Sequence, residues 1–380
     1  MPRAQMTSRE RILAAIRHEE PDRVPISPRV GAWMVAEYAD TSLARQLEVL
    51  PDMDFMHIIG GPGEHQICSN PQSYDIPGVQ VEQSRREAGD CVIFERTFRT
   101  PAGDISDVTR VPPSGREYGV SPNPVKLEFL IKSRDDLDAL RCILPPVRMS
   151  ADTVRAYQDQ LGDRGVVMVN IRSALDHNAG DARGMENLMI DYYTDRALFD
   201  DILRLFHQRS LAAAKAALEA GTEFIFGSWY YNSLSSGWSP AIFAEVFVPQ
   251  IREHVELTHS YGALYDYYDD GKLAQSMELI ADCGVDVLET CTPPPVGDFD
   301  LATAKRTIGE RVTLKGWVDL LYVVKHGTPE LVEQTVREGM AVARPGGGFI
   351  IGSSDSFREG TPRANIDTYF RACKQYGVYG

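Results

Sequence analysis

The sequence predicts an α/β protein, a (β/α)8 TIM barrel with an inserted β-hairpin or meander. Eight short apolar or β-branched runs are spaced along the chain, helical patterns separate the later ones, and 380 residues is a suitable length for such a barrel. A doubly wound open sheet is the competing architecture, but no GxGxxG motif follows the first predicted strand. We expect one domain over residues 1–380.

The predicted strands are short runs that end at glycine, proline or charged residues. The run VVMVNI is typical, because continuous apolar residues suit a parallel strand that is buried on both faces. The eight strands are predicted at residues 24–28, 55–61, 166–171, 223–231, 263–270, 285–291, 311–317 and 347–354.

Helical signals separate many of these strands. The first helix opens with a capping box formed by Thr7 and Glu10, and it stops before Pro21. A long amphipathic pattern from Ala197 to Ala220 is followed by Gly221, which suits a helix C-terminus. Further helices are predicted near residues 134–140, 240–261, 273–283, 299–308 and 329–343.

The stretch from residue 79 to residue 111 has a different pattern. Two Ala-Gly-Asp tripeptides, Ala88–Asp90 and Ala102–Asp104, interrupt its β-rich runs. Glycine at these points suits hairpin turns. We therefore expect a β-meander over residues 79–111, inserted into the barrel.

The composition is that of an ordinary globular protein with an acidic charge balance. The formal charge is −15 at pH 7 and the pI is about 5.0, so phosphate backbones and anionic lipid are repelled. The six cysteines include no CxxC pair, and no signal-peptide core or membrane-length apolar run is present. We expect a cytoplasmic protein that binds a small molecule and neither nucleic acid nor membrane.

The active site of a parallel barrel lies at the carboxyl ends of its strands. Carboxylates that gather there repel one another, so either one carboxyl keeps its proton near neutral pH or a cation sits among them. The candidate catalytic residues are Tyr268, Asp270, Glu289 and Asp355, and Asp270 and Glu289 are also the candidate ligands of a divalent metal. The candidate substrate-binding residues are Arg29, Arg172, His177, Trp229, Tyr230, Tyr231, Lys315 and Trp317.

Several of these residues also have an ordinary structural interpretation. Asp270 precedes Gly271 and could cap a helix or hold a turn, and Asp269 is expected to face solvent or a neighbouring helix. Glu289 could form a structural ion pair. Cys291 is most simply a small, buried apolar residue.

Both ends of the chain resemble the uroporphyrinogen decarboxylase superfamily. The opening RERILAAIRHEEPDRVPI and the closing GWVDLLYVVKHGTPELVEQTVREGMAVARPGGGFIIGSS carry the resemblance, with SPAIFAEVFVPQIREHV between them. The meander that contains FRTPAGDISDV resembles the methyltransferase-like branch more than the heme-pathway decarboxylases. The resemblance implies a single (β/α)8 barrel, and relatives are often homodimers.

The catalytic residues of this superfamily do not carry over. Its zinc-dependent methyltransferases have His-x-Cys-Gly where this chain has Tyr268–Gly271, and their later cysteine matches Gly352 or Ser353, so a thiolate zinc site cannot form. The catalytic aspartate of the decarboxylases matches Ile59–Gly61. Glu289 matches a glutamate ligand of the similar cobalamin-independent methionine synthases, which implies either a metal site rebuilt with oxygen ligands or a proton-transfer site without metal.

The resemblance implies an enzyme that takes a methyl group from a small methylated or methoxylated compound and delivers it to a corrinoid on a partner protein. Asp270, Glu289 or a tyrosine would protonate the leaving atom, or a metal would polarise it. The alternative is a decarboxylase or other lyase on a small non-porphyrin acid, whose carboxylate Arg29, Arg172 or Lys315 would bind. A barrel that binds a ligand without catalysis is a third interpretation.

Overall fold

The computed structural model describes residues 5–63, 68, 76–113 and 124–380. Its contacts divide the chain into two compact units. The first consists of Met1–Gly60, Ser150–Asn170 and Ala217–Gly380, and the second of Gly61–Met149 and Ile171–Ala216. The prediction of a single domain over residues 1–380 stays a prediction.

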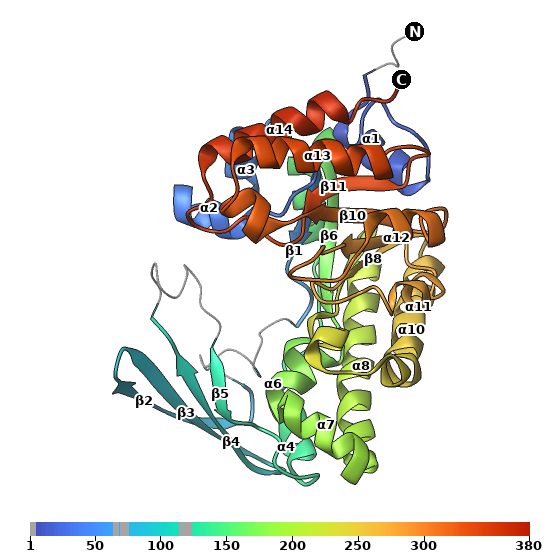
Figure 1. Cartoon of the computed structure of the whole chain (residues 1–380). Helices are drawn as coiled ribbons and strands as arrows, with labels where there is room; N and C mark the ends of the chain where they lie inside the picture. Colours follow the sequence, from blue (N-terminus) through green and yellow to red (C-terminus); the bar gives the residue numbers. More distant parts are fainter. Residues whose placement is uncertain (1–4, 64–67, 69–75, 114–123) are drawn as a thin grey trace. The chain divides into compact units, whose positions relative to one another are not determined.

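The first unit is built on a seven-stranded parallel sheet with the strand order β1-β6-β7-β8-β9-β10-β11 (Figure 1). Seven of the eight predicted strands are therefore confirmed. They are β1 Phe55–Ile59, β6 Gly165–Arg172, β7 Phe224–Ser228, β8 Leu264–Tyr268, β9 Val287–Thr290, β10 Thr313–Val318 and β11 Phe349–Ser353, and the last two residues of β6 belong to the second unit.

The predicted first strand, residues 24–28, is not a strand in the structure. Ile26 forms a single parallel bridge to Ile351, and its carbonyl accepts a hydrogen bond from the Asp54 amide at 2.8 Å. Pro25 and Pro28 have no N–H to donate, so a regular ladder cannot extend along this segment. The observed architecture is an α/β fold with seven paired strands, and the prediction of eight strands was wrong at this segment.

Helices cover the parallel sheet of the first unit. α13 lies where the sequence predicts it, whereas the predicted helix at residues 273–283 is shorter in the structure. The helices are α1 Ser8–Ile16, α2 Gly31–Tyr38, α3 Leu43–Val49, α5 Ala151–Leu161, α9 Pro240–Ile242, α10 Val248–Ser260, α11 Met277–Ala281, α12 Leu301–Thr307, α13 Pro329–Ala343 and α14 Arg363–Tyr376, with 3-10 or π turns η1 Gly162–Arg164, η3 Tyr230–Asn232, η4 Leu234–Ser236, η5 Phe243–Phe247 and η6 Leu320–Lys325.

Side chains from the sheet and from α1 form the apolar core of the first unit. Ile12 and Ala15 of α1 pack with Phe226, Tyr268 and Ile350 of the strands. The predicted capping box of α1 is present, because the Thr7 side chain accepts from the Glu10 amide and the Glu10 side chain accepts from the Thr7 amide. Within the described ranges, no helix is long and apolar enough to cross a membrane.

The second unit contains a four-stranded antiparallel sheet with the order β2-β3-β4-β5 (Figure 1). Its first three strands occupy the range in which the sequence predicts a meander, and Gly89 at φ +67° forms the first turn. The elements of this unit are β2 Gln80–Ala88, β3 Cys91–Thr100, β4 Gly103–Val111, β5 Val125–Glu128, α4 Asp136–Ile143, η2 Leu175–Ala179, α6 Gly180–Arg183, α7 Met185–Thr194 and α8 Arg196–Glu219, whose last three residues belong to the first unit.

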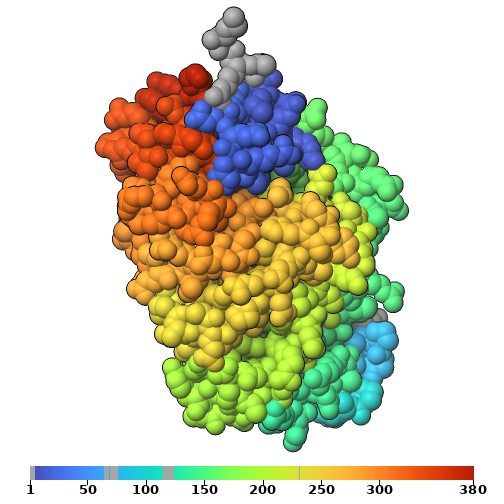
Figure 2. All heavy atoms as spheres, turned by 90° about the vertical axis from the view of Figure 1, so that its right-hand side faces the viewer, coloured from blue at the N-terminus to red at the C-terminus, as the bar shows by residue number. Residues whose placement is uncertain are grey.

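The N-terminal segment of the first unit lies beside its C-terminal residues. Figure 2 shows the blue N-terminal segment next to the red C-terminal segment, and Figure 1 agrees. The contact is partly main chain, because Arg23 forms an antiparallel bridge to Val378 and the Val24 amide donates to the Gly377 carbonyl at 2.9 Å. The two ends of the chain therefore hold each other in place.

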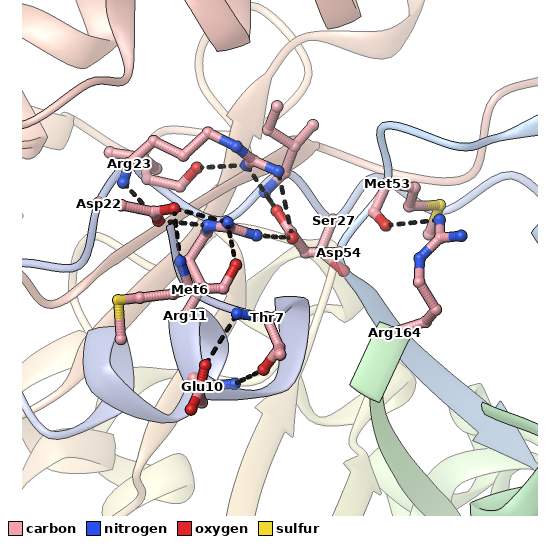
Figure 3. A network of polar contacts seen from close by, with 12 residues as sticks. Met6, Thr7, Glu10, Arg11, Asp22, Arg23, Ser27, Met53, Asp54 and Arg164 are labelled. Carbon is pink, nitrogen blue, oxygen red and sulfur yellow. Dashed lines mark hydrogen bonds and ion pairs between the residues drawn. The ribbon is translucent and has the colours of Figure 1, made fainter. Parts of the chain in front are cut away.

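A buried ion network fixes the same N-terminal segment (Figure 3). The Asp54 carboxylate accepts hydrogen bonds from Arg11 Nη1 at 2.6 Å, Arg23 Nη1 at 2.6 Å and the Ile26 amide at 2.7 Å. Asp22 accepts from Arg11 Nε and Nη2 at 2.6 and 2.8 Å. Two arginines thus balance two carboxylates, and the network ties the segment around residue 26 to the start of β1.

We predict that Asp54→Asn lowers the free energy of unfolding of the first unit by about 3–5 kcal/mol, because it leaves buried guanidinium groups without their charge partner. Urea denaturation measures the change. The matched control is Asp52→Asn, since Asp52 pairs with Lys374 at 2.7 Å at the surface. The control is expected to cost less than about 1 kcal/mol. Equal losses in the two variants would contradict the structural role of the network.

Candidate active site

Three neighbouring strands bring together residues that the sequence analysis selected separately. The parallel register places Tyr268 of β8 opposite Glu289 of β9, and Glu289 opposite Lys315 of β10. Residues opposite one another on adjacent strands project from the same face of a sheet. Accordingly, Lys315 Nζ lies 2.5 Å from Glu289 Oε1, and each side chain is only 2% exposed.

The Glu289–Lys315 ion pair is held in an interior that strongly disfavours isolated charges. Burial raises the pKa of Glu289, but the charges of Lys315 and Arg29 together hold it below its ordinary value. Glu289 is therefore an ionised carboxylate at neutral pH, and its negative charge is balanced by cations of the chain itself.

Asp266, which the sequence analysis did not select, lies fully buried beside Glu289. Burial and the charge of Glu289 raise the pKa of Asp266 well above its ordinary value. Both Asp266 oxygens and Oε2 of Glu289 have no donor among the described residues. A proton on Asp266 supplies that donor, and the two carboxyl groups then share a hydrogen bond. Strand parity could have identified Asp266, since it lies two residues before Tyr268.

Arg29 is the second cation of this region. Its guanidinium carbon lies 4.2 Å from the ring centroid of Tyr268 and 5.3 Å from that of Phe226. Tyr230 packs edge-on against Tyr268, with ring centroids 5.0 Å apart. These rings stabilise the cation through their faces. Its Nη1 atom, however, is buried and has no hydrogen-bond acceptor among the described residues.

Two further predicted acids lie close to Tyr268. The charges of Asp270 and Asp355 both act on its hydroxyl group, and Asp355 also forms an ion pair with Arg358 at 2.6 Å. The structure therefore brings together seven of the predicted site residues: Arg29, Tyr230, Tyr268, Asp270, Glu289, Lys315 and Asp355. Their catalytic and binding roles stay predictions.

The two predicted tryptophans lie outside this group of residues. Trp229 is fully buried, stacks on Tyr267 at 5.6 Å and donates from Nε1 to the Tyr265 hydroxyl at 2.9 Å. Tyr265 and Tyr267 have the parity opposite to that of Tyr268, so this cluster lies on the outer face of β8.

Trp317 leaves the inward face because the backbone of β10 is irregular at its end. Gly316 has φ +117° and Trp317 has φ +81°, which breaks the alternation that starts at Lys315. The Trp317 ring lies against Gly339 of α13, where an added Cβ would be 2.6 Å from it. Trp317, a candidate substrate-binding residue, therefore packs against α13 in the structure.

Two residues next to the site, Asp269 and Cys291, can be compared with their predicted surroundings. Asp269, which was expected to face solvent or a helix, is fully buried, and its Oδ1 accepts from the Gly271 amide at 3.0 Å. Cys291 is a buried small residue, as predicted. Its thiol contacts the Leu288 carbonyl at 3.3 Å, and burial raises the pKa of Cys291, so the thiol stays protonated.

Arg172 and His177 belong to the second unit and form a charged group there. Arg172 Nη1 lies 3.7 Å from Asp176, and His177 Nδ1 lies 2.9 Å from Asp181. Burial lowers the pKa of His177, but Asp181 and Asp176 together raise it above its ordinary value. The remaining predicted residue, Tyr231, has a side chain outside the described part of the structure.

A cavity of about 190 Å³ opens beside the charged residues of the first unit. Arg29 and Lys315 both contribute to its wall, and Met56, His57 and Ile58 of β1 provide a mainly apolar side. A small ligand in this cavity would contact two cations and a hydrophobic surface. This combination suits a compact organic molecule with an anionic or strongly polar group.

The residues around Glu289 do not fit the predicted divalent metal. Lys315 Nζ already contacts one oxygen of Glu289, and burial together with the charge of Glu289 raises the pKa of the neighbouring Asp266 well above its ordinary value. Hard cations bind several ionised or carbonyl oxygens at once. In the portions of the chain described by the structure, no group of three or more His, Cys, Asp or Glu residues is placed to hold a metal ion. We therefore assign no chemical step to a metal.

Comparison with known proteins identifies the family. A model of uroporphyrinogen decarboxylase (URO-D) matches residues 117–376, which is more than half of the chain. The chain belongs to the uroporphyrinogen decarboxylase family. This confirms the resemblance that both ends of the sequence carry, and no curated protein sequence matches the chain.

Solved structures show which fold this URO-D family member shares. A methyltransferase from Methanosarcina mazei aligns with a TM-score of 0.64 and 14% identity over 98% of this chain and 99% of that one. A D-psicose 3-epimerase, solved in the presence of D-fructose, aligns with a TM-score of 0.35 and 11% identity over 60% and 82% of the two chains. The first similarity establishes a common fold, and the second is too weak to carry an argument.

We predict that His57 makes the stability of this URO-D family protein depend on pH. Burial lowers the pKa of His57 from 6.5 to about 4. Between these values the unfolded chain binds a proton that the folded chain does not, so His57 lowers stability as the pH falls. Once the pH is well below 4, the free energy of unfolding is lower by about 3 kcal/mol than it would be without this shift.

The comparison is with His57→Asn, measured by urea denaturation from pH 7 to pH 4. The variant loses the stack on Tyr157 at every pH, in which the ring centroids are 5.6 Å apart. Its stability relative to the wild type should nevertheless improve as the pH falls. Parallel stability curves would show that His57 does not titrate as the structure implies.

Proposed function

We propose that this protein is an enzyme that removes a methyl group from a small methylated or methoxylated compound and passes it to a corrinoid carried by a partner protein. The observation that carries the proposal is a cavity lined by both Lys315 and Arg29, of which Arg29 has a buried Nη1 with no acceptor among the described residues. The shared fold with a methyltransferase supports it. The single bridge between Ile26 and Ile351 also supports a barrel in which residues 24–28 take the eighth strand position.

The residues of the cavity would divide the work between binding and proton supply. Arg29 Nη1 would bind an anionic or polar group of the substrate, while Met56 and Ile58 contact its hydrocarbon part. A leaving oxygen or nitrogen that loses its methyl group gains negative charge, which the Lys315 ammonium on the same wall would neutralise. The corrinoid would supply the nucleophile that accepts the methyl group.

A lyase reaction on a small carboxylic acid is the second candidate. The same two cations on one wall favour it, because Arg29 and Lys315 together suit a carboxylate. In that reaction Arg29 would hold a carboxylate that stays on the substrate, and the site would return a proton to carbon after CO₂ leaves.

We predict that the purified protein demethylates at least one member of a panel of methoxylated aromatic acids when a corrinoid protein in its Co(I) state is present. Arg29→Gln should raise KM about tenfold to a hundredfold, because it removes a charged hydrogen bond to the substrate. Corrinoid absorbance measures methylation. Arg45→Gln is the matched control, since Arg45 pairs with Glu48 on the exposed face of α3.

The same panel separates the two candidate reactions. Substrates with an isotopic label in the carboxyl group report decarboxylation as released CO₂. Release of labelled CO₂ without corrinoid methylation would replace methyl transfer by the lyase reaction. Binding of panel members without either reaction would support a ligand-binding barrel and contradict both enzymatic proposals.

A further inference from the structure

The carboxyl cluster of the first unit contains its own cation. The sequence predicts a divalent metal at Asp270 and Glu289. Several carboxyl groups that share one interior need a positive charge beside them. Lys315 Nζ lies 2.5 Å from Glu289 Oε1, and both side chains are buried. A metal ion bound to this oxygen of Glu289 would have to occupy this same position. The position next to Glu289 is therefore already filled by an ammonium group.

The cations of the chain already meet the charge of Glu289 without a further ion. Glu289 contributes one negative charge, and Lys315 in contact with it contributes one positive charge. Arg29 adds a second positive charge that also acts on Glu289. A divalent ion beside Glu289 would face the Lys315 and Arg29 cations, which is the reverse of the environment that such ions need.

We propose that Lys315 is the resident cation of this active site, where it takes the position and the electrostatic role predicted for a divalent metal. The Glu289 carboxylate orients the Lys315 ammonium through their contact. Lys315 and Arg29 both line the same cavity, so the two cationic residues border the space that a bound molecule would occupy.

The catalytic part of this inference rests on the proposed function. A corrinoid acceptor would supply the electron pair for the methyl carbon, so the bond between that carbon and the leaving oxygen would break with its electrons kept on oxygen. Lys315 gives one N–H proton to this oxygen and becomes a neutral amine. Solvent then returns a proton to the Lys315 amine after the product leaves, and Glu289 holds the restored ammonium in place.

The first test needs no activity measurement. Protein purified without chelator is analysed for divalent metals, and its thermal unfolding is followed before and after EDTA treatment. We expect less than about one tenth of an equivalent of metal and an unchanged Tm, because such ions need several ionised or carbonyl oxygen ligands and Lys315 already contacts Glu289 Oε1. One equivalent of metal that is lost in Glu289→Gln, with a lower Tm after EDTA, would overturn the proposal.

The second test changes the charges themselves. Lys315→Met leaves the buried Glu289 carboxylate without its partner, so the ratio of unfolded to folded protein should rise roughly a hundredfold or more. Lys315→Met combined with Glu289→Gln removes both charges and should recover most of that loss. Lys374→Met is the matched control, because Lys374 pairs with Asp52 at 2.7 Å at the surface.

The double variant keeps the test decisive even if Lys315→Met alone does not fold. A folded double variant beside an unfolded single variant supports the proposal. A Lys315→Met protein as stable as Lys374→Met contradicts it. If the metal and stability results hold but no panel substrate is demethylated, the proposed function fails while the assignment of the cation stands. If demethylation occurs and Lys315→Met with Glu289→Gln retains full kcat, the catalytic role of Lys315 fails alone.

Discussion

The site depends on one constraint, which is that its charged side chains are buried from solvent between the parallel strands and their neighbours. A carboxylate buried there is stable only with a cation in contact or with a proton of its own. Glu289 meets this condition through Lys315 and Asp266 through protonation. The same condition governs the structural network at Asp54, which is held by two arginines, and Asp107 of the second unit, which Arg96 and Lys126 contact.

The two charge groups of the first unit differ in function: the network at Asp54 stabilises the fold, and the group around Glu289 is the candidate site of chemistry. The Asp54 network is closed, because its carboxylate is saturated by donors from the chain. The group around Glu289 is open on one side, where Lys315 and Arg29 border a cavity. An ammonium and a guanidinium with unused donors can act on a bound molecule, whereas saturated groups cannot. The proposed chemistry follows from this difference.

Much of the fold and part of the site could be predicted from the sequence. Seven strands were found because continuous apolar runs mark buried parallel strands, and Glu289 and Lys315 were selected because they end such runs. Residues 24–28 were wrongly predicted to form a strand, because prolines interrupt the hydrogen-bond ladder there. The direction of the Trp317 side chain was wrongly predicted, because the positive φ of this residue breaks the alternation of side chains along the strand. Asp266 was missed because it lies in the middle of a strand, and the need for its proton becomes evident only from the burial of Glu289 beside it.

The protonation state of Asp266 tests the account most directly. Infrared spectra of the wild type and of Asp266→Asn at neutral pH would be compared in the region of the carbonyl stretch of a protonated carboxylic acid. The account predicts such a band in the wild type, which persists above pH 7 and is lost in the variant. Its absence from the wild type would mean that Asp266 and Glu289 are both ionised, so the hydrogen bond that the account places between the two carboxyl groups could not form.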